Sequence, residues 1–211
     1  YGDHRDLHYP LRRQRQMCIR DRNRTMEALT NLLTRNSPRE LTLPMPSKDD
    51  MDEIYQAALR APDHAWLRPS RFIEVTGKGI ERLSKIFTEF AKNEFEDVSS
   101  LQMEKYQAAP FRAPMIIILA TKIVEHPKVP KTEQMLSTAA AAENILLALH
   151  AKGFAGMWRT GKFAFNKKIA EYLKLTSDHE IIGYLYVGTP TGKSKKIPKM
   201  DIENFVTVWD K

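Results

Sequence analysis

Three loop segments of this 211-residue chain combine cationic side chains with hydrogen-bond donors. In the first, Arg35-Asn36-Ser37-Pro38-Arg39, two guanidinium groups and a hydroxyl fall within five residues. That set suits a phosphate monoester, because a guanidinium can hold two oxygens of an oxyanion at once. Judged by spacing alone, a solvated helix end explains the segment better.

The second and third segments stand beside expected strands. The second, 61–69, places His64, Trp66 and Arg68 in one loop between a helix and a strand. The third, 156–161, offers backbone N–H groups and Arg159 where a strand ends, which is a common place for ligands. Taken alone, the second is explained by loop polarity and the third by an ordinary strand-to-helix connection.

Other kinds of site lack their sequence signatures. The histidines at 64, 126, 150 and 179 are scattered, and none of these four belongs to a His-x-x-x-His or Glu-x-x-His pair, so we expect no metal site. The single cysteine, Cys18, excludes a disulfide framework and every multi-thiolate zinc or iron–sulfur site. The nucleophile-elbow and P-loop motifs are absent, which argues against hydrolases and P-loop enzymes.

Residues 1–25 differ from the rest of the chain. They hold seven Arg, show no helical or strand periodicity and lack the apolar core of a secretory signal. Back-translation of residues 16–22 matches the transposon-end adapter used in preparing sequencing libraries. We therefore expect 1–25 to be a non-native or disordered extension and 26–211 to be a single domain; the alternative is a genuine basic arm that binds nucleic acid.

The formal charge of +7 comes mostly from that extension. Without it the chain carries 26 basic and 23 acidic residues, a net charge of +3, and no basic run with interleaved aromatic residues marks a nucleic-acid groove. The longest uninterrupted apolar run, 115–120, is far below the ~18 residues of a membrane span. We expect no nucleic-acid partner, no membrane partner and a cytoplasmic location.

The elements that position the three segments follow from apolar periodicity and helix caps. Ser47 is a good N-cap for a helix ending near 61, with Asp50 in the capping-box position. The helix over 133–152 is apolar nearly all round, as in a helix buried inside a subunit or between subunits. The other expected helices are 26–35, 80–95, 101–108 and 166–173, and the expected strands are 72–75, 115–121, a short one near 156–158, 181–187 and 205–209. This order favours α+β or α/β with one sheet.

Read together, the segments resemble one family. From 26 to about 209 the chain is similar to the flavin-dependent nitroreductases, specifically the small YdjA-like subgroup. The motifs that carry the likeness are Met26-Glu27-Ala28-Leu29, Thr34-Arg35-Asn36-Ser37, Ala58-Leu59-Arg60-Ala61-Pro62-Asp63-His64, Arg71-Phe72-Ile73, Ala109-Pro110-Phe111-Arg112-Ala113-Pro114, His126-Pro127-Lys128-Val129-Pro130, Gly156-Met157-Trp158-Arg159-Thr160-Gly161 and Gly183-Tyr184-Leu185-Tyr186-Val187-Gly188-Thr189-Pro190.

The resemblance implies an α+β nitroreductase-like fold, with a central, mostly antiparallel sheet flanked by helices. It also implies a domain-shared homodimer with FMN sites at the subunit interface. NADH or NADPH would reduce the flavin, and a small electron-poor acceptor such as a nitroaromatic or a quinone would then reoxidise it, in a ping-pong mechanism. No side chain is expected to be catalytic, because the cofactor carries the chemistry.

The resemblance also assigns cofactor-binding residues. Arg35, Asn36 and Ser37 belong to the motif that holds the flavin phosphate. Arg60 and His64 would reach the flavin from the partner subunit. The flavin edge would be lined by Trp158, Arg159 and Thr160, and positive charge near the phosphate would come from Lys193 and Lys195.

Three departures from the family pattern bear on function. Asn36 stands where the family usually has a second Arg, Ser70 replaces a Trp, and Lys131-Thr132 replaces an Arg-Trp pair. The lost aromatic surface leads us to expect a different choice of acceptor. It also motivates the alternative hypothesis of a flavin-binding sensor or storage protein without significant turnover.

Overall fold

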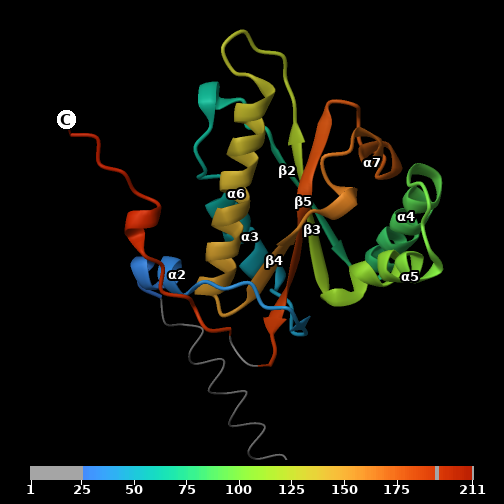
Figure 1. Cartoon of the computed structure of the whole chain (residues 1–211), viewed down its shortest axis with the longest axis horizontal. Coiled ribbons are helices and arrows are strands. Elements are labelled where there is room, and N and C mark those ends of the chain that lie inside the picture. Colours follow the sequence, from blue (N-terminus) through green and yellow to red (C-terminus); the bar gives the residue numbers. More distant parts are fainter. Residues whose placement is uncertain (1–25, 193–194, 211) are drawn as a thin grey trace, which may run out of the picture.

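The computed structural model describes residues 26–192 and 195–210, so the extension 1–25 and Lys193 lie outside the described residues. Within the described part of the chain, five strands form one antiparallel sheet with the order β1-β5-β3-β2, and β4 pairs with β5 (Figure 1). The strands are β1 (Leu41–Thr42), β2 (Ser70–Thr76), β3 (Met115–Lys122), β4 (Ala155–Arg159) and β5 (His179–Pro190). The expected α+β fold with a central antiparallel sheet is confirmed.

Helices cover both faces of this sheet. On one face lie α3 and α6, and on the other lie α4, α5 and α7 (Figure 1). The helices are α2 (Ala28–Thr34), α3 (Lys48–Ala58), α4 (Lys78–Glu94), α5 (Ser100–Ala108), α6 (Lys131–Ala151) and α7 (Lys167–Tyr172), joined by the short 3₁₀ helices η1 (His64–Trp66), η2 (Ala109–Arg112), η3 (Gly161–Phe163) and η4 (Ile202–Asn204). Within the described residues, no helix combines the length and the apolar character that a membrane crossing requires.

The central strand β3 divides the core into two clusters. Ile116 and Ile118 face the cluster under α4, whereas Ile117 and Leu119 face the cluster under α3 and α6. All four side chains are buried, because successive residues of a strand point to opposite faces and both faces of β3 are covered. This confirms the central strand predicted over 115–121.

The start of α3 has the predicted capping box. The Ser47 hydroxyl accepts a hydrogen bond of 3.1 Å from the Asp50 backbone N–H, and the Asp50 carboxylate accepts one of 3.1 Å from the Ser47 backbone N–H. These bonds satisfy two donors that a helix start otherwise leaves open.

The long helix α6 is buried along one stripe. Ala142, Ile145 and Leu149 are fully buried against the sheet and α3, whereas Leu136 is 63% exposed. Only some of the apolar side chains of the helix expected over 133–152 are therefore buried inside this chain.

The prediction of a strand over 205–209 is wrong. In the structure η4 precedes this segment, which carries no strand and leaves Phe205 and Trp209 exposed. Aromatic and β-branched residues favour a strand, but a strand needs a neighbouring edge to satisfy its backbone groups. No strand within 26–192 or 195–210 pairs with the segment.

Candidate functional site

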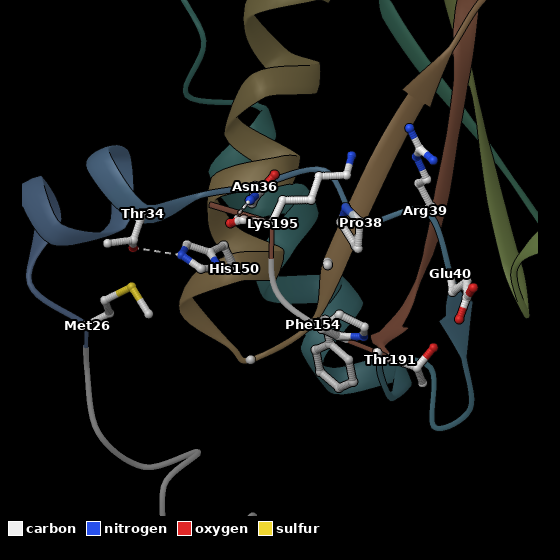
Figure 2. Close-up of a pocket in the computed structure, with 14 residues that line it drawn as sticks. Met26, Thr34, Asn36, Pro38, Arg39, Glu40, His150, Phe154, Thr191 and Lys195 are labelled. Carbon is white, nitrogen blue, oxygen red and sulfur yellow. Dashed lines mark hydrogen bonds between the residues drawn. The ribbon is translucent and has the colours of Figure 1, made fainter. Parts of the chain in front are cut away.

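The loop that follows α2 brings together three of the predicted phosphate-binding residues. Arg35 caps the helix, and its Nη1 donates a hydrogen bond of 3.3 Å to the Ser37 hydroxyl. The Asn36 side-chain amide donates to the Lys195 carbonyl at 3.0 Å (Figure 2). The Lys195 ammonium donates to the Ser37 carbonyl at 2.6 Å. Residues near both ends of the described chain therefore form one cluster of cationic and hydroxyl groups.

A carboxylate on α6 orients the Arg35 guanidinium. Its Nε lies 3.2 Å from Oε1 of Glu143, and the Arg35 side chain is 26% exposed. Because the contact uses Nε and the Ser37 contact uses Nη1, N–H groups of the guanidinium remain for an oxyanion. Glu143 was not among the predicted site residues. The sequence feature that could have identified Glu143 is that it is a lone carboxylate between the apolar runs 139–142 and 145–149.

A cavity of about 680 Å³ opens beside this loop (Figure 2). It lies between the end of α6, the start of β4 and the turn after β5. Asn36, Arg39, Glu40, His150 and Lys195 supply its polar lining, and Pro38, Phe154 and Ala155 are among its apolar residues. Positive side chains outnumber the single carboxylate of the lining, as an anionic ligand requires.

The imidazole of His150 adds no positive charge to the cavity at neutral pH. Burial, and then the positive charge of Arg35, lower the pKa of His150. Its Nε2 lies 3.0 Å from the Thr34 hydroxyl, which closes this side of the cavity (Figure 2). The fixed cations beside the loop are thus Arg35, Arg39 and Lys195.

The strand β4 leads away from the cavity and carries the third predicted segment. Its side chains alternate: Trp158 packs against the cluster under α6, and its indole N–H donates to the Ile182 carbonyl at 3.3 Å. Arg159 points to the other face, where its guanidinium lies 5.4 Å from the Tyr186 ring centroid. Trp158 and Arg159 therefore share a backbone edge but not a side-chain surface, and Thr160 is exposed just beyond them.

The Arg159 guanidinium lies in an electrostatically unfavourable place. Its Nε is buried without a hydrogen-bond partner in the described part of the chain. Burial, and then the nearby charge of Arg112, lower the pKa of Arg159. The contact with the Tyr186 ring offsets part of this cost, since an aromatic face attracts a cation.

The second segment lies at the opposite end of α6. His64 Nδ1 is 2.7 Å from Oε2 of Glu133, in the first turn of α6. Glu133 and Glu143 are ten residues apart on one helix, which corresponds to ~15 Å along its axis. Figure 1 shows the same separation, with α2 at the lower end of α6 and the connection from α3 to β2 at the upper end. One chain therefore does not bring His64 to the Arg35–Ser37 loop. Arg60 lies between the two places, because the Ala57 carbonyl accepts a hydrogen bond of 3.0 Å from the Asn144 side-chain amide and the Pro62 carbonyl accepts one of 2.7 Å from the Ser137 hydroxyl.

Arg60 instead lines a second cavity, of about 710 Å³, between the end of α3 and the start of β2. Arg68, Arg71 and the exposed Trp66 line the same cavity. Arg68 belongs to the second segment of the sequence. Its position beside Arg60 was not predicted, because the turn around η1 determines where Arg68 lies.

Within the described residues, no group of three or more His, Cys, Asp or Glu side chains could hold a metal ion.

A family model and a similar known protein both relate this chain to the nitroreductases. The sequence model of the nitroreductase family matches residues 32–189. A protein of Escherichia coli (strain K12) named "Putative NAD(P)H nitroreductase YdjA" is 36% identical over 185 residues, which cover 87% of this chain and 100% of that protein.

Two solved structures share the fold. The nitroreductase-like family protein from Bacillus cereus matches with a TM-score of 0.75 and 20% identity, over 89% of this chain and 98% of that chain. The nitroreductase with bound FMN from Bacteroides fragilis NCTC 9343 matches with a TM-score of 0.68 and 21% identity, over 88% of this chain and 100% of that chain.

Proposed function

This chain belongs to the nitroreductase family, and we propose that it is an FMN-dependent oxidoreductase that works as a homodimer. The reductant is NADH or NADPH, and the final acceptor is a nitroaromatic, a quinone or a similar electron-poor molecule. The chemistry that FMN supplies when bound is uptake of a hydride from the nicotinamide and delivery of electrons to the acceptor.

Asn36 and Lys195 line the first cavity, whereas Arg35 and Ser37 stand next to them in the loop and do not line it. Together these donors fit the phosphate of this cofactor. Arg35 and Ser37 present a guanidinium and a hydroxyl 3.3 Å apart, and Lys195 adds an ammonium within the same cluster. A phosphate monoester accepts several charge-assisted hydrogen bonds, and Arg is well suited to give two of them. Glu143 fixes the guanidinium through Nε and so presets its orientation. This donor set is the observation that carries the proposal.

The free edge of β4 fits the ring system. β4 pairs with β5 on one side, and no described strand pairs with its other side. The backbone groups at the end of β4 are therefore available to the polar edge of a ligand. Its five residues run from the cavity at Ala155 to Arg159, a rise of ~13 Å.

A second copy of the chain accounts for Arg60 and His64. His64 lies at the end of α6 opposite to the Arg35–Ser37 loop, and Arg60 lies between the two. If two α6 helices pack antiparallel about a two-fold axis, the His64 end of each copy meets the Arg35 end of the other. The face of α6 that carries the exposed Leu136 is available for this contact. In this arrangement each site draws residues from both chains.

No side chain needs to act as nucleophile or general acid in this mechanism. The protein binds the phosphate, orients the ring and excludes water, while reductant and acceptor use the same cleft in turn. That order predicts ping-pong kinetics.

Anaerobic mixing tests the proposal. The flavin-loaded protein is mixed with NADPH or NADH, and the visible flavin absorbance is followed. The proposal predicts rapid bleaching with at least one reductant, and return of the colour when a nitroaromatic is added. A yellow protein that neither reductant bleaches would contradict the enzyme and favour the sensor or storage protein.

A further inference from the structure

The cavity of about 710 Å³ beside η1 is lined by three guanidinium groups, those of Arg60, Arg68 and Arg71. The one carboxylate of its lining is Asp63, whose Oδ2 accepts a hydrogen bond of 2.7 Å from the Arg68 backbone N–H. Among the described residues none of the three guanidinium groups forms an ion pair. Three guanidinium groups against one carboxylate leave the cavity with a surplus of positive charge.

The three arginines have different tasks. Arg71 Nη1 donates to the carbonyls of Arg68 and Ser70, at 2.7 and 2.8 Å, and so ties the loop to the start of β2. No described group accepts a hydrogen bond from the guanidinium of Arg60 or Arg68, and both side chains belong to exposed residues. Arg71 is thus a positioning residue, and Arg60 and Arg68 are the groups available to a ligand.

The loop holds Arg68 in place at a conformational cost. Ala65, Trp66 and Arg68 have φ angles of 56°, 55° and 48°, a region that residues with a Cβ seldom adopt. The hydrogen bond from the Arg68 backbone N–H to Asp63 and the one from Arg71 to the Arg68 carbonyl maintain this geometry. It turns the Trp66 side chain outward, 80% exposed, with the Arg68 guanidinium 5.9 Å from its ring centroid. An exposed indole beside unpaired cations offers an apolar wall to a planar anionic ligand.

We propose that Arg68, beside the flavin-facing Arg60, forms a subsite for an oxyanion carried by one of the substrates. The inference rests on the proposed function, because the two-fold arrangement is what brings this end of α6 to the site of the other copy. Two sources fit the chemistry: the 2′-phosphate of NADPH and a carboxylate on the acceptor. The flavin phosphate itself is assigned to the cluster at the other end of α6.

Equilibrium binding to the flavin-loaded protein tests the subsite without turnover. Calorimetry compares NADP⁺ with NAD⁺, which differ only in the 2′-phosphate, and 4-nitrobenzoate with 4-nitrobenzamide, which are close in shape and differ in charge. The variants are R68Q and R68K. The matched control is R82Q, which removes an exposed guanidinium from α4 on the other face of the sheet.

We expect R68Q to weaken binding of one charged ligand by about tenfold or more and of its uncharged counterpart by less than about twofold. R68K should fall between wild type and R68Q, because an ammonium lacks the planar fork. The pair that responds identifies the source of the oxyanion. R82Q should bind all four ligands as wild type does.

Three results would overturn the subsite. In the first, R68Q changes none of the four affinities; in the second, it weakens both members of a pair equally; in the third, it releases the flavin, which would assign the cluster to the cofactor. Failure of the proposed function is a separate observation. It would be seen as wild-type protein that does not bleach with NADPH or NADH, whatever the calorimetry shows.

Discussion

Asn36 and Lys195 lie 159 positions apart in the sequence, yet the Asn36 side-chain amide donates a hydrogen bond of 3.0 Å to the Lys195 carbonyl. The bond fastens the segment after β5 to the loop after α2, and the Lys195 ammonium returns a bond to the Ser37 carbonyl. Asn36 thus positions a cation from the far end of the sequence.

The substitution Asn36→Ala should therefore weaken FMN retention by about two- to tenfold, because one neutral hydrogen bond contributes ~0.5–1.5 kcal/mol. The dissociation constant is measured by titrating FMN into the apoprotein. The control is Asn93→Ala, which removes an exposed amide bonded to Tyr172 on the other face of the sheet. Equal effects of the two substitutions would contradict the role given to Asn36.

Arg35→Ala should weaken FMN retention by more than tenfold, since loss of a hydrogen bond to a charged group costs ~1.5–3 kcal/mol. Glu143→Gln keeps the shape of the partner and removes its charge, so it should have the smaller effect. Flavin content per chain, measured after dialysis, compares the two variants. Unchanged flavin occupancy in Arg35→Ala would show that the phosphate assignment is wrong.

Leu136→Glu should convert the protein to single chains and release flavin. The side chain is 63% exposed on α6, and a charge there opposes burial against a second copy. Leu101→Glu is the matched control, because Leu101 is 58% exposed on α5, on the other face of the sheet. Sedimentation velocity reports the mass. A two-chain species that persists in Leu136→Glu and keeps its flavin would place the interface elsewhere.

Asp50→Asn should destabilise the fold in a pH-dependent manner. Partial burial opposes ionisation of Asp50, but hydrogen bonds from Ser47 and Lys152 outweigh it and lower the pKa of the carboxyl. A lowered pKa means that the ionised form stabilises the fold. We expect a loss of ~1 kcal/mol at neutral pH, typical of a helix cap, which shrinks as the pH falls below ~3.9, the ordinary value for Asp. Urea unfolding at several pH values measures it. A pH-independent difference would contradict this origin.

Local signals predicted much of the fold. The apolar run of β3 and the Ser47–Asp50 cap depend on nearest neighbours and on burial, so both could be inferred without tertiary information. The segment over 205–209 has the aromatic and β-branched residues of a strand, but the sequence could not reveal whether a sheet edge was near. Its apolar side chains remain exposed in the structure.

The candidate site was less predictable for a similar reason. The Arg35–Ser37 segment could be identified by its residue types, whereas the Glu143 contact depends on how α2 meets α6. The opposite directions of Trp158 and Arg159 follow from strand alternation, once β4 is known to include both. The cavity beside η1 depends on three left-handed residues that are not glycine, and no sequence rule anticipates those.

The central claim is that two copies of the chain hold FMN between them. Size-exclusion chromatography with light scattering and visible absorbance tests it directly on the FMN-supplied protein. We predict one peak with the mass of two chains, carrying the flavin absorbance at one flavin per chain. A colourless peak with the mass of one chain, after FMN has been supplied, would contradict the account.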